Sequence, residues 1–77
     1  MNNEQIKAAK SLQTALNKCA KSGLSGGVYD GTFCIWPTGE DPEAGANSKK
    51  YIDFFDAVDH LGMQLSTNMY LDGGAGN

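Results

Sequence analysis

The stretch GGVYDGTFCIW, residues 26–36, decides the fold class. β-branched and aromatic side chains dominate it, and the Asp30-Gly31 pair in its middle is typical of the two-residue turn of a β-hairpin. We therefore expect antiparallel strands over 26–29 and 32–36, with a single strand bulged at Gly31 as the alternative.

The glycines indicate where the helices lie. All ten of them fall outside residues 1–22 and 46–61. Because glycine destabilises helix interiors and favours turns and caps, these two segments are the helix candidates. We expect a first helix over 3–22, ended by Gly23, and a second over 48–61.

Both expected helices are amphipathic, with apolar residues at helical spacing. The stripe of the first consists of Ile6, Ala9, Leu12, Leu16, Cys19 and Ala20. The stripe of the second consists of Tyr51, Phe54, Phe55, Val58 and Leu61. We expect both stripes to supply the core.

The segment 63–72 alternates between apolar and polar residues, which predicts a strand with one wet face. Between the hairpin and the second helix, residues 37–47 form an acidic loop in which Pro42 predicts one helical turn before Gly45. The resulting order α-β-β-α-β predicts an α+β domain, with the two helices packed on one face of a small, mainly antiparallel sheet. We expect this single domain to span residues 1–72 and a flexible glycine-rich tail to span 73–77.

Composition and charge exclude several classes of protein. Leu, Ile, Val and Phe make up only 14 of the 77 residues, but charged residues are also few, at 19%, so we expect a small folded domain. The net charge of −3 combines four lysines and one glutamate in residues 1–22, giving +3, with two lysines and eight acidic residues in 23–77, giving −6. Such an acidic chain is not expected to bind nucleic acid directly. It has neither a secretory signal pattern nor an apolar run that could span a membrane, so we expect a soluble, cytoplasmic protein.

The candidates for chemistry are few. His60 is the single histidine and lies one helical turn after Asp56, so a small-ligand or metal-binding site around these two residues is one hypothesis. No nucleophile motif accompanies them, and Cys19 and Cys34 lack the spacing of a redox or zinc motif. We therefore predict no enzyme, no metal and no cofactor.

The expected outer surfaces carry more information. Asp53, Asp56 and Asp59 recur every three residues on the second helix, away from its apolar stripe. Trp36 ends a strand, and Tyr70 lies on the polar face of the last one; exposed aromatics are common anchors of interfaces. These five residues are our candidate partner-binding set.

A second candidate patch lies on the first helix, opposite its apolar stripe. Four lysines fall within an arc of about 80° at 100° per residue, and they are Lys7, Lys10, Lys18 and Lys21. Each of these patches has the simpler interpretation of a solvated helix face. The leading hypothesis is a small non-enzymatic module that binds another protein, for instance an inhibitor or modulator acting through its acidic helix face and exposed aromatics. A homodimeric structural protein, in which basic and acidic faces meet, is a further alternative.

Overall fold

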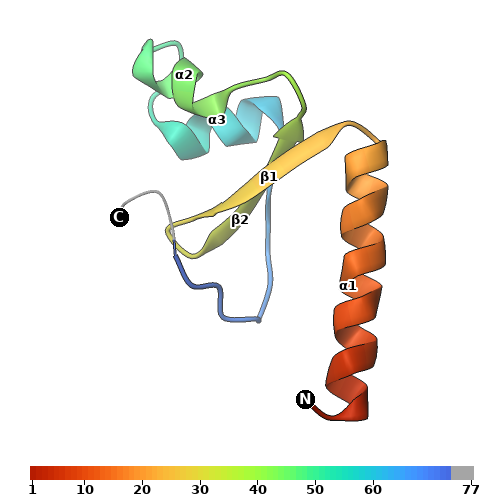
Figure 1. The fold of residues 1–77 in the computed structure, drawn as a ribbon. Helices are drawn as coiled ribbons and strands as arrows, with labels where there is room; N and C mark the ends of the chain where they lie inside the picture. Colours follow the sequence, from red (N-terminus) through yellow and green to blue (C-terminus); the bar gives the residue numbers. More distant parts are fainter. Residues whose placement is uncertain (74–77) are drawn as a thin grey trace.

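The hairpin predicted around Asp30 and Gly31 forms the centre of the computed structural model, which describes residues 1–73 (Figure 1). Strand β1 (Leu24–Tyr29) pairs with strand β2 (Thr32–Pro37) in antiparallel fashion. Asp30 and Gly31 have φ angles of 51° and 75°, and two positive values are what a type I′ turn requires. The hairpin is confirmed, and the alternative of one bulged strand is wrong.

Strand β3 (Met63–Leu65) adds to the other side of β2, giving the order β1-β2-β3. The prediction of a strand over 63–72 is therefore too long. Leu65 pairs with Phe33, and β2 begins at Thr32, so the partner strand ends almost where β3 does. An alternating sequence without a neighbouring strand has no partner for its backbone hydrogen bonds, and the chain continues irregularly.

The tail predicted over 73–77 lies outside the described residues except for Gly73. The carbonyl of Gly73 accepts a hydrogen bond from the N–H of Gly31 at 3.3 Å. The last described residues therefore return to the hairpin turn.

Helix α1 (Asn3–Lys21) has the predicted boundaries to within one residue. Asn2 and Gln5 form a reciprocal capping box with two bonds of 2.8 Å, which satisfies N–H groups at the helix start. Gly23 follows the helix with φ 79°, the left-handed conformation expected after a helix end.

The second predicted helix, over 48–61, forms only from residue 54 onward, and the helical turn predicted at Pro42 is a separate short helix that runs past Gly45. The short α2 (Pro42–Asn47) begins after the cap Asp41, and α3 (Phe54–Leu61) begins after the cap Asp53. Tyr51 lies between them, and its ring would be 2.8 Å from a Cβ on Gly45. Glycine inside α2 thus makes room for an aromatic ring.

The two faces of the sheet differ in what covers them. One, which we call the α3 face, carries Tyr29, Cys34 and Trp36, and the ring of Phe54 on α3 lies 4.1 Å from that of Tyr29. Residues on the other face, here called the open face, are Leu24, Gly26, Val28, Phe33, Ile35, Met63 and Leu65.

The α+β class, the antiparallel sheet and the element order are confirmed. The helices do not share one face, however: α3 packs on the α3 face, whereas α1 contacts β1 and stands beside the open face (Figure 1). The connections allow this arrangement, because α1 joins the edge strand β1 through two residues, whereas α3 joins β3 at the opposite edge of the sheet.

The core is correspondingly thin and lies on one side of the sheet. Within residues 1–73, its fully buried apolar residues are Cys34, Ala57 and Val58, together with Pro42 of α2. No residue of α1 is buried, so the prediction that its stripe supplies the core is wrong. The molecule measures 46 × 27 × 17 Å, and its radius of gyration of 14.1 Å exceeds the roughly 11.5 Å of a compact chain of this length.

Candidate binding surface

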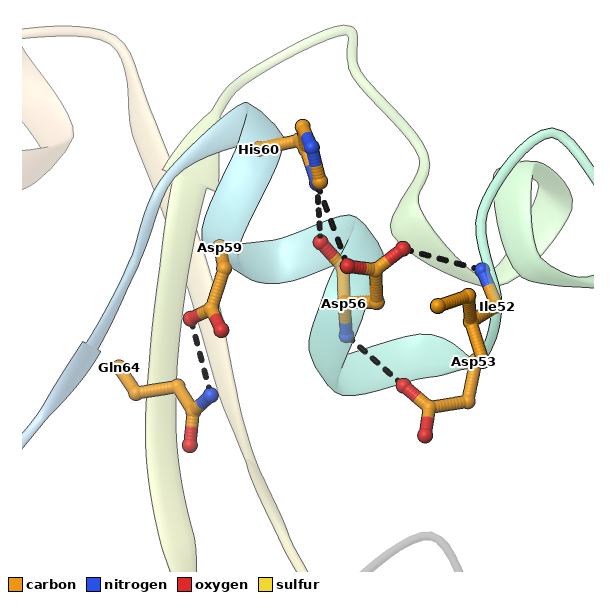
Figure 2. A network of polar contacts seen from close by, with 6 residues as sticks. All are labelled: Ile52, Asp53, Asp56, Asp59, His60 and Gln64. Atoms are coloured by element: carbon orange, nitrogen blue, oxygen red, sulfur yellow. Dashed lines mark hydrogen bonds and ion pairs between the residues drawn. The ribbon is translucent and has the colours of Figure 1, made fainter.

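The first of the three predicted partner-binding carboxylates, that of Asp53, caps α3 (Figure 2). Its Oδ1 accepts a hydrogen bond of 2.8 Å from the backbone N–H of Asp56. This bond satisfies one of the N–H groups that a helix start leaves without a partner.

The carboxylate of Asp56 holds the turn before α3 and faces His60. Its Oδ2 accepts a bond of 3.0 Å from the N–H of Ile52, and its Oδ1 lies 3.5 Å from Nδ1 of His60. The same Nδ1 lies 2.8 Å from the backbone oxygen of Asp56. Because a carbonyl oxygen only accepts, this hydrogen bond requires the proton on Nδ1. Two backbone groups, the N–H of Ile52 and the carbonyl of Asp56, therefore already engage this His–Asp pair.

Asp59 is directed elsewhere in Figure 2, toward β3. Its Oδ1 accepts a bond of 2.9 Å from the side-chain amide of Gln64. Each of the three carboxylates thus holds a different part of α3 in place, which explains their spacing without a partner. Their role in binding a partner stays a prediction.

The thiol of Cys34 lies beneath α3. Burial raises the pKa of this thiol, and the carboxylate of Asp59 raises it further. A thiol held in its protonated form is a poor nucleophile. In residues 1–73, no three His, Cys, Asp or Glu side chains converge in a geometry that could hold a metal ion.

An open hollow of about 440 Å³ lies beside His60. Tyr51 stacks on the imidazole at 5.1 Å, and Lys49, Lys50 and Asp56 complete its polar lining. This hollow is the place where the predicted small-ligand site would lie.

The structure does not bring the two predicted aromatic anchors together. Trp36 is half-buried on the α3 face, with its ring 6.2 Å from Tyr29 and 6.1 Å from Phe54. Tyr70 is 84% exposed and follows Met69, which borders the open face. Only Tyr70 therefore presents its ring to solvent.

The predicted lysine patch lies along the exposed outer side of α1. The four lysines Lys7, Lys10, Lys18 and Lys21 are exposed, and within residues 1–73 none of them forms an ion pair. The basic face is therefore available to negatively charged groups of another molecule.

One apolar surface that is not among the predicted sites is a groove beside α1. This groove, of about 450 Å³, separates α1 from the open face. One wall is the stripe of α1, with Leu12 48% and Leu16 40% exposed. The floor comes from the sheet and the far rim from the irregular segment after β3; these residues are Leu24, Val28, Phe33, Ile35, Leu65, Met69 and Leu71.

The sequence did contain a signal of this groove. The stripe over residues 3–22 and the alternation over 63–72 are both visible in the sequence, but such a stripe predicts a contribution to a core and not the wall of an open groove. A chain with so few large aliphatic residues cannot form a core on both sides of a sheet. The low aliphatic content therefore indicates that one face of the sheet stays uncovered.

Comparisons with protein-family models, with curated proteins and with solved structures gave no match. Nor does any helix within residues 1–73 combine the length and apolar character needed to cross a membrane. The function of the surface must therefore be argued from its own chemistry.

Proposed function

We propose that this protein is a small non-enzymatic module that works by binding another protein chain, as an inhibitor or modulator does. Its binding surface is the groove between α1 and the open face, and the ligand is an amphipathic helix of the partner. The observation that carries the proposal is that a helix stripe and a sheet face, both apolar, line the same open groove. Exposed contiguous apolar surface of this kind is characteristic of protein-binding sites.

The chemistry elsewhere in the molecule supports binding rather than catalysis. The Cys34 thiol has a raised pKa, and the His60 ring is already bonded to its own helix. An active site needs a nucleophile or base that is free to reach a substrate. We also propose a cytoplasmic location, which the two free cysteines support.

A pair of matched variants tests the proposed surface. Leu65→Lys places a charge on the groove floor, whereas Ile52→Lys places the same charge on a residue that is 90% exposed and does not line the groove. Immobilised wild type and both variants are incubated with native lysate, and the bound proteins are quantified by mass spectrometry. We expect a protein that wild type and Ile52→Lys retain and Leu65→Lys loses. Identical binding by all three proteins would contradict the proposal.

The hollow beside His60 favours a second candidate function, the binding of a small anionic ligand. Lys49 and Lys50 supply positive charge there, and Tyr51 offers a ring for stacking. Thermal denaturation with inorganic phosphate tests it: stabilisation that His60→Ala abolishes is expected, and unchanged melting with phosphate would rule the candidate out.

A further inference from the structure

We propose that the helix bound in this groove is α1 of a second copy of the chain, so that two copies form a twofold dimer in which each α1 packs in the groove of the other. This inference rests on the proposed function, because it takes the groove to be a protein-binding surface. It adds the identity of the partner.

The chain exposes more surface than a compact monomeric protein of its mass. A monomeric protein of 8.2 kDa exposes about 4,500 Å² of surface. This chain exposes 5755 Å², so about 1,200 Å² of additional surface is open. A standard interface buries about 800 Å² on each partner. The excess is therefore sufficient for a stable dimer.

The apolar arc of α1 is too wide for one neighbour. Leu12, Leu16 and Cys19 face the protomer's own groove. Ile6, Ala9 and Ala20 extend the apolar arc to about 140° at 100° per residue, whereas a helix packed on a single layer needs an apolar stripe of about 100°. The remainder of the arc is available to a second helix.

Twofold symmetry matches these surfaces to each other. In an isologous interface the same patch serves both partners, so a protomer must carry both the helix and the groove that receives it. This chain carries both, and Leu12 lies at the midpoint of the 19-residue α1. Two antiparallel α1 helices that cross at Leu12 therefore place each Leu16 against the apolar arc of the other copy.

Charge also favours a second copy. Residues 1–22 carry +3 and the rest of the chain carries −6. The α1 of one copy is consequently attracted to the acidic remainder of another as the two approach, although none of the residues that line the groove is charged, and this attraction weakens with added salt. A dimer built this way uses the predicted lysine patch for the approach of the two copies.

Mass measurement across a dilution series tests the proposal, with variants matched in charge. Leu16→Glu places a carboxylate in the apolar arc, and Ser11→Glu places one on the exposed opposite side of the same helix. We expect wild type and Ser11→Glu to have twice the chain mass of 8.2 kDa. For Leu16→Glu we expect a dissociation constant raised about 100-fold, tenfold for each of its two symmetric sites. If Leu16→Glu loses the helical signal in its circular dichroism spectrum, Leu12→Glu is measured in its place.

The reactivity of Cys19 distinguishes the other outcomes. Cys19 lines the groove, while Cys34 is fully buried, so a thiol reagent reports on the groove through Cys19. In the dimer we expect labelling to accelerate on dilution. A monomer in which Cys19 is protected would mean that α1 closes on its own sheet. A dimer whose dissociation constant is unchanged by Leu16→Glu would mean that the copies meet through another interface. Either result overturns the inference. A monomer with a reactive Cys19 also overturns it, but the proposed function stands if Leu65→Lys still abolishes binding of a different protein.

Discussion

Substitutions of Asp53 test whether this acidic residue stabilises α3 or contacts a partner. The side chain of Asp53 caps α3 through one bond of 2.8 Å to the N–H of Asp56. Asp53→Ala removes the acceptor and the charge together. Asp53→Asn removes the charge and keeps an oxygen in the capping position, because Asn caps helices as well as Asp does.

The magnitude follows from the length of α3 and from what it buries. Loss of an N-cap costs about 1 kcal/mol. An eight-residue helix has little stability of its own, so the loss is transmitted to Ala57 and Val58, two of the fully buried apolar residues. For Asp53→Asn only the interaction of the charge with the helix dipole is lost, about 0.3 kcal/mol.

Urea unfolding at one fixed protein concentration measures both variants. With a slope of about 1 kcal/mol/M for a small domain, we expect the midpoint to fall by about 1 M for Asp53→Ala and about 0.3 M for Asp53→Asn. Equal destabilisation by the two variants would refute the capping argument. A loss of partner binding in Asp53→Asn at nearly unchanged stability would instead show that the carboxylate contacts a partner.

Two further predictions concern the core beneath α3. Gly62→Ala would place a Cβ against the backbone of Ile35 and Trp36, so we expect the free energy of unfolding to fall by about 3 kcal/mol; unchanged stability would contradict this packing. The raised pKa of Cys34 gives a pH dependence, because the unfolded chain releases the thiol proton at the ordinary pKa of 9.0 while the folded protein retains it. The free energy of unfolding should therefore decline as pH rises above 9.0, and urea titrations should show a smaller decline in Cys34→Ala.

Features fixed by local chemistry could be predicted from the sequence. The turn at Asp30 and Gly31 needs two positive φ angles, and Asp-Gly is among the residue pairs that adopt them readily. The start and end of α1 likewise depend on Asn2 and Gly23, each acting within its own helix end. Such signals act over a few residues and need no knowledge of the rest of the fold.

Features that depend on a neighbour could not be predicted in the same way. The alternation over 63–72 is real, but β3 ends where its partner β2 runs out. The spacing of the aspartates places Asp53 on a charged helix face, and its competing use as a cap is visible only once the helix start is known. The sequence likewise contains the stripe of α1 without saying which surface covers it.

An isotope-filtered nuclear Overhauser experiment on a mixture of labelled and unlabelled protein tests the central claim most directly. Only contacts between copies give signals in such a sample. We predict cross-peaks from the methyl groups of Ile6 and Leu16 in one copy to those of Val28 and Leu65 in the other. If contacts between α1 and the open face appear only within one copy, and none appear in the filtered spectrum, the groove is not filled by a second chain.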